Sequence, residues 1–583
     1  MNDTELGPLA RPVEERLEQL ERDQVVRRLE GGDASLWKSS PLVEKEIRDR
    51  LGWLHVVGGD EEPARRPGGP GQLVGYVGRT VNWMDLPGHL RVADLQNLKS
   101  ELYKEGFRDV AVLGMGGSSL APEVFAQTFK TPSGALALHV LDTTDPAAIR
   151  ALEQSIDVKT TVFIVASKSG TTLETLSHYH YFWSRTGGQG RQFIAITDPG
   201  TPLAEDADKQ GFRRVYLNRE DIGGRYSALS YFGLVPAALG GVDLVNLTLH
   251  AVDMVQDCSA SVPIKENPGA WLGAVFAESA KAGRDKITII APPPVETFGL
   301  WAEQLIAEST GKEGKGLIPI AGEAVGPPEV YGNDRLFVQL VISPSAALPT
   351  SGREDSDDRL KALADAGHPV VTLKMSEPIA LGAEFFRWEF AIAVAGAILG
   401  INVFDQPNVQ EAKDLTKQVL AEGKLPTVGE GIRWAGQQGS TLDAAVQAML
   451  KQIEPGDYVA LLAYIAPTAV HDDALNAIRL AIRDKYHVAT TVGYGPRYLH
   501  STGQLHKGGP NTGVFLEVVG DDPNDIAIPG ESFTFGVLKQ AQGLGDFQAL
   551  RNHGRRVLRV QVREVAQGLV KIGQAVGATV PVA

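Results

Sequence analysis

Four hydroxyl side chains and one lysine stand within the six residues 167–172, whose sequence is SKSGTT. The apolar run before them predicts a strand, and the residues LET after them predict the start of a helix. Hydroxyl groups and free backbone N–H groups at a helix start can surround a dianionic phosphate. A simpler interpretation is a capping box, because Thr171 and Glu174 have the S/T-x-x-E spacing. A cap needs only one hydroxyl, so four hydroxyls favour a phosphate site.

A second loop, GMGGSS at 114–119, also lies between a predicted strand and a predicted helix. Glycines let the backbone approach a ligand closely, and the helix start favours an anion. Gly114 and Gly116 match the first two glycines of the dinucleotide motif GxGxxG, and Asp142 ends the next predicted strand, near where a ribose-binding acid would sit. Ser119 occupies the position of the third glycine, so dinucleotide binding is the weaker alternative.

Six segments in chain order resemble the motifs of one family. They are GMGGSSLAP from residue 114, SKSGTTLET from 167, GGRYS at 223–227, ESTGK at 308–312, FDQ at 404–406 with a lysine at 413, and LHKGGPN at 505–511. Together they are similar to the signatures of the glucose-6-phosphate isomerase family, whose lobes are sugar-isomerase (SIS) domains. The likeness is greatest to the isomerase portion of bifunctional transaldolase/phosphoglucose isomerase proteins. This resemblance implies reversible isomerisation of glucose 6-phosphate and fructose 6-phosphate through an enediolate.

The resemblance assigns roles to residues that would otherwise look ordinary, since a single charged residue on a helix usually faces solvent. It implies that Glu308 is the base that moves the proton between C2 and C1, and that Lys413 helps to open the sugar ring. It places Arg225 at the enediolate oxygens, where a permanently charged fork of donors is useful. The implied substrate and phosphate residues are Gly116, Gly117, Ser118, Ser167, Lys168, Ser169, Thr171, Thr172, Glu174 and Gln406. Because a base works best with a pKa near the working pH, we expect Glu308 in a partly desolvated pocket.

Ring opening needs a proton shuttle, and histidine has the pKa nearest neutrality. The family's usual histidine precedes the FDQ signature, but the tract 343–404 contains only His368, which lies in no recognisable motif. The segment LHKGGPN resembles a histidine tract of some bacterial members, displaced past the FDQ signature. Because the histidine tract follows the FDQ signature in this chain, the resemblance implies that part of the second lobe has been duplicated or reordered. We therefore predict that His506 is the ring-opening histidine, with His368, His500 and a purely structural role as alternatives.

Other functions have less support in the sequence. A sugar-phosphate sensor would need the hydroxyl loops but would have no use for Glu308 and Lys413. An isomerase that also accepts mannose 6-phosphate would differ only in details of the pocket. His178 and His180 lie two residues apart, on different faces of a helix, and predict packing or surface positions rather than a metal site. The aldose–ketose proton transfer needs no metal, and we predict no cofactor.

Short β-rich runs that alternate with helical patterns predict an α/β fold with parallel sheets covered on both faces. The predicted strands lie at 109–114, 138–142, 161–166, 192–197, 215–217, 286–291, 336–343, 369–374, 457–465, 487–493 and 514–519, followed by a helix at 562–577. We predict a helical N-terminal segment (1–85), two doubly wound SIS-like lobes (86–245 and 246–425) and a C-terminal α/β region (426–583). The tracts 58–71 and 344–358 are rich in turn-forming or polar residues and predict surface loops.

Composition narrows the class of protein further. The 583 residues include 56 Lys and Arg against 71 Asp and Glu, a net charge of −15 that repels phosphate backbones, so a nucleic-acid partner is not expected. Cys258 is the single cysteine, which fits a reducing compartment, and the charged N-terminus lacks the apolar stretch of a signal peptide. The apolar run 390–404 is too short to span a bilayer. We expect a cytoplasmic protein that binds a sugar phosphate, forms a homodimer as the family commonly does, and has a functional link to transaldolase.

Overall fold

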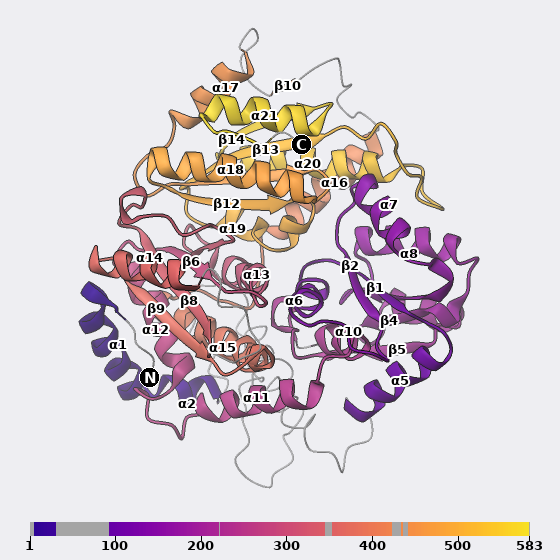
Figure 1. The fold of residues 1–583 in the computed structure, drawn as a ribbon, viewed down its shortest axis with the longest axis horizontal. Helices are drawn as coiled ribbons and strands as arrows, with labels where there is room; N and C mark the ends of the chain where they lie inside the picture. The colour runs from indigo at the N-terminus through magenta and orange to yellow at the C-terminus, as the bar shows by residue number, and fades with distance from the viewer. Residues whose placement is uncertain are drawn as a thin grey trace.

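The computed structural model describes residues 5–30, 92–220, 222–343, 353–422, 433–434 and 441–581. Its elements form three parallel-stranded sheets with helices packed on their faces (Figure 1). The first sheet lies on the right of Figure 1, the second on the left and the third at the top. The α/β class that the sequence predicts is therefore confirmed.

The first sheet contains five parallel strands in the order β2-β1-β3-β4-β5. Its strands are β1 (Asp109–Gly114), β2 (Ala137–Leu141), β3 (Thr161–Ala166), β4 (Phe193–Thr197) and β5 (Arg214–Leu217). Its helices are α5 (Val92–Lys104), α6 (Leu120–Thr128), α7 (Pro146–Ser155), α8 (Leu173–Arg185), α9 (Pro202–Lys209) and α10 (Tyr231–Gly240). Helices α5, α6 and α10 share one core with one face of the sheet, and α7, α8 and α9 share another with the opposite face. This double coverage explains why β1 and β3 are almost entirely apolar.

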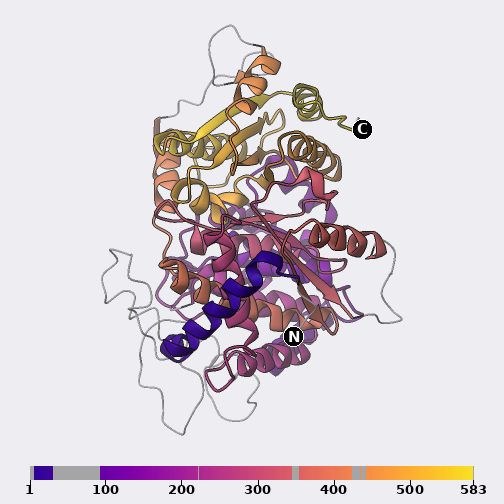
Figure 2. The same ribbon diagram turned by 90° about the vertical axis from the view of Figure 1, so that its left-hand side faces the viewer.

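The second sheet contains four parallel strands in the order β7-β6-β8-β9. Its strands are β6 (Lys286–Ile290), β7 (Ile318–Ala321), β8 (Arg335–Ile342) and β9 (Val370–Met375). Its helices are α11 (Leu244–Asp257), α12 (Pro268–Lys281), α13 (Phe298–Thr310), α14 (Arg353–Asp365) and α15 (Leu381–Leu399). The N-terminal helices α1 (Ala10–Arg22) and α2 (Val25–Glu30) pack on this part of the molecule, and α1 is seen in front in Figure 2.

The third sheet follows α16 (Val409–Glu422) and has the order β10-β14-β13-β11-β12. Its strands are β10 (Arg433–Trp434), β11 (Tyr458–Tyr464), β12 (Ala489–Tyr494), β13 (Gly513–Gly520) and β14 (Arg556–Val562), and only β10 is antiparallel to its neighbour. Its helices are α17 (Leu442–Leu450), α18 (Ala469–Tyr486), α19 (Gly503–Gly508), α20 (Phe535–Asn552) and α21 (Val565–Val576). If the parallel strands are counted within each sheet, all three sheets contain the order 2-1-3-4.

This shared order determines where ligands bind. In such sheets the strand order reverses between the first and third strands, and ligands bind beyond the carboxyl ends of those two strands. In the first sheet these strands are β1 and β3. The two loops that the sequence singles out, 114–119 and 167–172, are the loops that leave these strands.

The three sheets share apolar cores. One core joins β1 and β3 of the first sheet to β6 and β8 of the second, and another joins the second sheet to β11 of the third through Ile318 and Tyr458. A third core brings Phe535 of α20 against α8. Helices α6 and α13 lie where the sheets meet in the centre of Figure 1.

Most strand predictions agree with the structure within one or two residues, but three strands are missing from them. The strand β7 is only four residues long and contains Pro319, which is typical of a loop. The strand β14 begins at Arg556 and was not predicted, and neither was the two-residue β10. The predicted loop at 58–71 lies outside the described residues, as do residues 344–352 of the predicted loop at 344–358, and α14 begins at Arg353.

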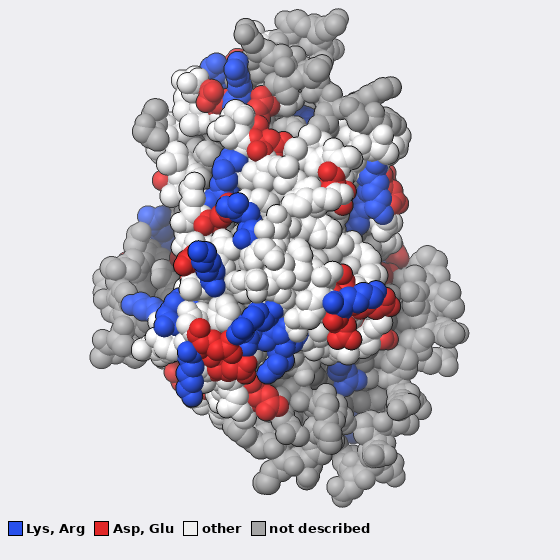
Figure 3. Space-filling view, turned by 90° about the vertical axis from the view of Figure 1, so that its right-hand side faces the viewer, with Lys and Arg blue, Asp and Glu red and all other residues white. Residues whose placement is uncertain are grey.

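Two surface observations complete the fold. On the face seen in Figure 3, positive and negative side chains lie in mixed clusters, separated by broad uncharged areas. Among the helices that the structure describes, none is long and apolar enough to cross a membrane.

Candidate active site

The loop that follows β3 is held by hydrogen bonds between its own hydroxyl groups. Ser167 Oγ lies 2.9 Å from Thr172 Oγ1, and Ser169 Oγ lies 2.9 Å from Thr171 Oγ1. Thr172 is the N-cap residue of α8, and its side chain makes no capping hydrogen bond. The predicted capping box is therefore absent at this helix start, and the side chain of Glu174 faces other partners.

A cavity of about 170 Å³ opens beside this loop. The residues around it include Ser169, Thr171, Thr172, Glu174, Lys413 and His500. The three hydroxyl residues come from the first sheet, Lys413 comes from α16, and His500 comes from the loop after β12 of the third sheet. The cavity thus joins hydroxyl donors, a carboxylate, an ammonium group and an imidazole from distant parts of the chain.

Glu174 and His500 form a buried pair at this cavity. His500 Nε2 lies 2.9 Å from Glu174 Oε1, and the Glu174 side chain is only 8% exposed. Burial by itself favours the neutral acid, but His500 and Lys413 outweigh it and hold the pKa of Glu174 at about 2. Glu174 is therefore a carboxylate at neutral pH and can orient the imidazole and stabilise its protonated form.

His506, the predicted ring-opening histidine, lies elsewhere. Its ring packs against Tyr458, Tyr498 and Phe515, with ring centroids 6.5, 5.8 and 5.1 Å away. Only 2% of the residue is exposed, and burial among these rings lowers its pKa well below the ordinary value. The residues that line the cavity do not include His506. His500, which stands six residues earlier, is the histidine that lines the cavity.

Two other histidines, His368 and His178, have packing positions. His368 lies against Tyr331 and Phe337 in a separate small core. His178 is fully buried, stacks on Phe535 and lies 2.9 Å from the backbone oxygen of Thr143. Across the described ranges, no group of three or more His, Cys, Asp or Glu side chains could hold a metal ion.

Glu308 and Arg225 form a second buried pair. Glu308 lies in the last turn of α13 and is 6% exposed, so its predicted burial is confirmed. Arg225 Nη1 lies 3.6 Å from Glu308 Oε2 and donates a hydrogen bond of 2.7 Å to Gln406 Oε1. Arg225 Nη2 donates to the backbone oxygens of Val403 (2.6 Å) and Asp405 (3.0 Å). The GGRYS and FDQ segments therefore meet at Glu308, although about 180 residues separate them.

Gln304 connects this pair to the histidine. Its Nε2 donates to Glu308 Oε2 at 3.1 Å and to the backbone oxygen of His500 at 2.7 Å. Gln304 lies one turn before Glu308 on the same face of α13. Only one side chain thus separates the Glu308 carboxylate from the His500 loop.

Lys312 fixes the FDQ segment in place. Its Nζ donates to the backbone oxygens of Asn402 and Asp405 and to Asp405 Oδ1, the last at 2.5 Å. Burial and the nearby Arg225 outweigh the attraction of Asp405 and lower the pKa of Lys312 to about 7. All three directions of the ammonium group are used, so Lys312 holds the segment that carries Gln406.

The glycine loop after β1 packs against both neighbouring loops. Gly116 has φ +55°, and a Cβ there would lie 2.7 Å from the backbone oxygen of His500. A Cβ on Gly117 would lie 1.9 Å from the backbone oxygen of Gly224. These two glycines are therefore required for close approach of three loops, and Ser118 beside them is buried.

The predicted phosphate residues divide into two groups. Ser169, Thr171, Thr172 and Glu174 line the cavity, whereas Gly116, Gly117, Ser118, Ser167, Lys168 and Gln406 are not among its lining residues. Lys168 pairs with Asp198 and donates to the backbone oxygen of Glu220 at 2.7 Å. It thus ties the hydroxyl loop to the neighbouring segments of the first sheet.

The sequence gives no signal for several residues of the site. Thr144 and Gln542, which contact each other and reach Glu174 through Gln542, are 398 residues apart in the chain. Gln304 could have been found, because it precedes Glu308 by one helical turn. His500 lies in none of the six motif segments, so the sequence offers it only as an alternative to His506.

Comparisons with known proteins agree with this geometry. Residues 98–315 match the family model described as phosphoglucose isomerase, and they include both loops of the first sheet, Arg225 and Glu308. Over this part of the chain the sequence is therefore similar to the phosphoglucose isomerase family.

Relatives in this family cover different shares of the chain. The chain is 30% identical over 355 residues to the glucose-6-phosphate isomerase of Thermosynechococcus vestitus, an alignment that covers 54% of this chain and 66% of that protein. It is 28% identical over 443 residues to a glucose-6-phosphate isomerase of Thermus thermophilus, an alignment that covers 68% of this chain and 98% of that protein. The chain thus spans just under two thirds of the first protein and almost all of the second.

A solved structure shares the fold. The crystal structure of a glucose-6-phosphate isomerase from Chlamydia trachomatis superposes with a TM-score of 0.51 at 20% identity. That superposition covers 69% of this chain and 87% of the other.

Proposed function

We propose that this chain interconverts glucose 6-phosphate and fructose 6-phosphate by proton transfer through an enediolate. The observation that carries the proposal is the convergence of six family motifs on one region. Hydroxyl donors, the Glu174–His500 pair and Lys413 surround one cavity, and the buried Glu308–Arg225 pair is joined to it through Gln304. The family names of the relatives support the same reaction.

In this proposal the substrate phosphate binds at the start of α8. Ser169, Thr171 and Thr172 supply hydroxyl donors there, and the helix start favours the dianion. Lys413 and His500 then act on the ring oxygen and the C1 hydroxyl of the bound pyranose. Because Glu174 is ionised beside His500, it favours the imidazolium that forms when the histidine takes a proton.

The open-chain sugar then reaches Glu308. Its carboxylate takes the proton from C2, the C–H electron pair forms the C1–C2 double bond, and the carbonyl pair moves onto O1 to give the enediolate. The carboxylate then returns the proton to C1, while the proton of the C2 hydroxyl passes to O1 and leaves the C2 carbonyl. Arg225 supplies permanent positive charge next to this base, where negative charge develops on the substrate oxygens. Neither step requires a cofactor, because the proton and the electron pair stay within the substrate and Glu308.

A sugar-phosphate sensor is not favoured, because a binding module has no need for a buried carboxylate next to a buried arginine. The substrate range beyond glucose 6-phosphate is a matter of pocket detail. Homodimer formation, a functional link to transaldolase and a cytoplasmic location are further proposals that rest on the family resemblance. Analytical ultracentrifugation of the full chain tests the first of these.

The test of this reaction is an activity assay. The purified wild-type chain and its Glu308→Gln variant are each incubated with glucose 6-phosphate in the presence of EDTA and without nucleotide. We expect fructose 6-phosphate from the wild type and a loss of about a thousandfold in kcat for the variant. The variant should still bind the sugar phosphate. A wild type that binds the sugar phosphate and never converts it would contradict the proposal.

A further inference from the structure

One side chain from the third sheet holds Glu174 in addition to His500. Gln542, on α20, donates from Nε2 to Glu174 Oε1 at 2.7 Å, and His500 lies 2.9 Å from the same oxygen. Gln542 is 3% exposed and lines the cavity. The carboxylate oxygen that faces the histidine thus has two nitrogen partners, and both come from the third sheet.

The orientation of this amide is determined by its other end. The hydroxyl of Thr144 donates to Gln542 Oε1 at 2.8 Å, and Thr144 is fully buried. With its oxygen engaged by Thr144, the amide must present its NH₂ group to Glu174. A buried amide with both ends paired has one favoured position, since turning it over would place its oxygen against the Glu174 carboxylate, an acceptor facing an acceptor.

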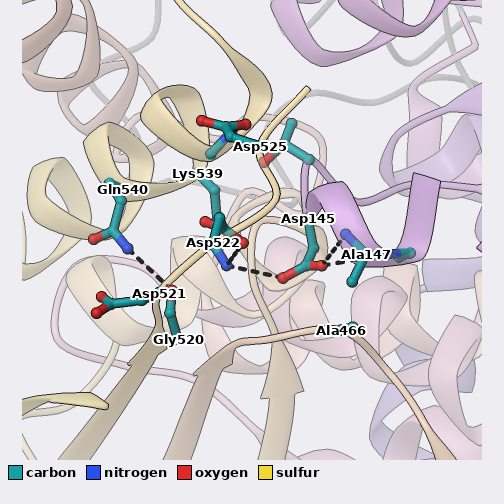
Figure 4. Close-up of polar contacts among 12 residues, drawn as sticks. Asp145, Ala147, Ala466, Gly520, Asp521, Asp522, Asp525, Lys539 and Gln540 are labelled. Atoms are coloured by element: carbon teal, nitrogen blue, oxygen red, sulfur yellow. Dashed lines mark hydrogen bonds and ion pairs between the residues drawn. The ribbon is translucent and has the colours of Figure 1, made fainter. Parts of the chain in front are cut away.

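A salt bridge one turn earlier anchors the same helix (Figure 4). Lys539 is 1% exposed at its side chain and lies 2.9 Å from Asp145 Oδ2 and 2.7 Å from Asp522 Oδ1. Asp145 also caps α7 by accepting the backbone N–H of Ala147 at 2.8 Å. Helix α20 therefore binds two adjacent residues of the loop after β2. Lys539 pairs with Asp145, and Gln542 accepts a hydrogen bond from Thr144.

This contact occupies the position where the third sheet would bind its own ligand. Its strand order reverses between β11 and β13, and the loop 520–522 leaves β13 at that point. In the first sheet the matching region holds the hydroxyl loop, but in the third sheet it is filled by Lys539 and its two carboxylate partners. The carboxyl end of the third sheet is thus used for docking on the first.

We propose that Gln542 is a positioning residue that holds the Glu174 carboxylate in line with His500, so that ring opening depends on the docking of α20. This inference rests on the proposed isomerase function. Gln542 acts through Glu174 and His500, so its removal affects the ring-opening step. It leaves the Glu308 proton transfer unchanged.

Two substrates separate these steps. Exchange between the anomers of glucose 6-phosphate, followed by NMR, reports ring opening. A four-carbon aldose 4-phosphate has no free hydroxyl that can close a ring, so its isomerisation reports proton transfer alone. For Gln542→Leu we expect anomer exchange to fall about tenfold, which is the loss of one hydrogen bond to a charged group, while turnover of the acyclic substrate stays within about twofold.

The variant Gln540→Leu is the matched control. Gln540 lies on the same helix and donates to the backbone oxygen of Gly520 at 3.0 Å, a contact inside the third sheet (Figure 4). Both rates should match the wild type in this variant. Equal loss of both rates in Gln542→Leu, or unchanged anomer exchange, would overturn the inference.

Gln542→Glu keeps the shape of the side chain and gives a pH-dependent readout. While the new acid is neutral it can donate its O–H to Glu174, and once ionised it repels that carboxylate. The charged or titratable groups near Glu174 and Gln542 are His500, Lys413, Lys417, the Lys507–Asp546 pair and the buried His178, and they are unchanged in the variant. Anomer exchange relative to the wild type should therefore fall as the pH rises between about 5 and 8. A pH-independent ratio would overturn the inference, whereas a wild type without isomerase activity would instead refute the proposed function.

Discussion

The pKa of Glu174 is set by two opposing effects, its burial and its charged or polar neighbours. Burial would make it a neutral acid, yet His500 and Lys413 keep its pKa at about 2. The carboxylate accepts a hydrogen bond from His500 Nε2 and so fixes the orientation of the imidazole at the cavity. The function of the cavity therefore depends on the match between His500 and Glu174 rather than on either residue alone.

Substitution of the two neighbouring histidines should give opposite results. His500→Asn should lower anomer exchange about a hundredfold and leave the acyclic substrate unaffected, because the proton shuttle is lost. His506→Asn should leave both rates within about threefold and lower the free energy of unfolding by about 2 kcal/mol, because it disturbs an aromatic core. NMR exchange and urea denaturation measure the two effects. Loss of ring opening in His506→Asn alone would restore the assignment made from the motif.

The site residues differ in how far the sequence predicts them. Glu308, Arg225 and Lys413 stand in or beside motifs that the sequence itself displays, so they could be proposed from the sequence. His500 was not chosen, because its role depends on a contact with Glu174 across 326 residues of chain. A motif contains residues that are close in sequence, whereas His500 and Glu174 meet only because the third sheet packs on the first.

At the scale of elements, the loop after α13 and the FDQ segment act as one unit through Lys312. Lys312→Met leaves Asp405 as a buried carboxylate without its ammonium partner. We expect the free energy of unfolding to fall by about 3 kcal/mol and kcat/KM to fall as Gln406 loses its position. Lys315→Met is the control, because Lys315 is exposed and donates to the backbone oxygen of Leu399 at 3.3 Å. Equal stability of the two variants in urea would contradict this role.

The contact between α8 and α20 should respond to acid. Burial lowers the pKa of His178 to about 4, so below about pH 6.5 the unfolded chain binds a proton that the folded chain does not. Stability is complete above pH 6.5 and falls by about 1.4 kcal/mol per pH unit until about pH 4. His178→Phe keeps the stacking on Phe535 and removes this term. Urea midpoints at several pH values should therefore fall less steeply for the variant, and parallel slopes would contradict the explanation.

Elements with strong patterns were predictable, and weak or long-range ones were not. The continuous apolar run of β3 specifies a buried parallel strand wherever it is placed. The short β7 exists because β6 offers it a partner edge, which overrides the presence of Pro319. Three strands of the third sheet were predicted, but their order was not, since it depends on pairings that no local pattern contains.

At the scale of the whole molecule, buried hydrogen bonds and ion pairs join the third sheet to both of the others. Glu323 and Arg335 of the second-sheet region form a fully buried ion pair of 3.1 Å, and Arg479 of α18 donates to the backbone oxygen of Ala321 at 3.0 Å. Lys539 of α20 makes the corresponding buried contact with the first-sheet region, an ion pair with Asp145. A buried network of this kind favours one arrangement of the three sheets, because any other leaves charges unpaired.

This arrangement brings Glu308 and the His500 loop together within one chain, through Gln304. We therefore expect that Glu308→Gln and His500→Asn chains, mixed by co-expression, regain no activity beyond the sum of the two variants. In a site shared between subunits, by contrast, mixed dimers would contain some intact sites. Recovery of a substantial fraction of wild-type turnover would contradict a site made from one chain.

The central claim is that His500 with Glu174 opens the ring and that Glu308 then moves the proton. Both events can be followed in one NMR experiment on glucose 6-phosphate in D₂O, which records anomer exchange and deuterium uptake at C2. For Glu308→Gln we predict that anomer exchange continues near the wild-type rate while deuterium uptake falls about a thousandfold. Loss of both signals together, or continued deuterium uptake in that variant, would contradict the division of roles.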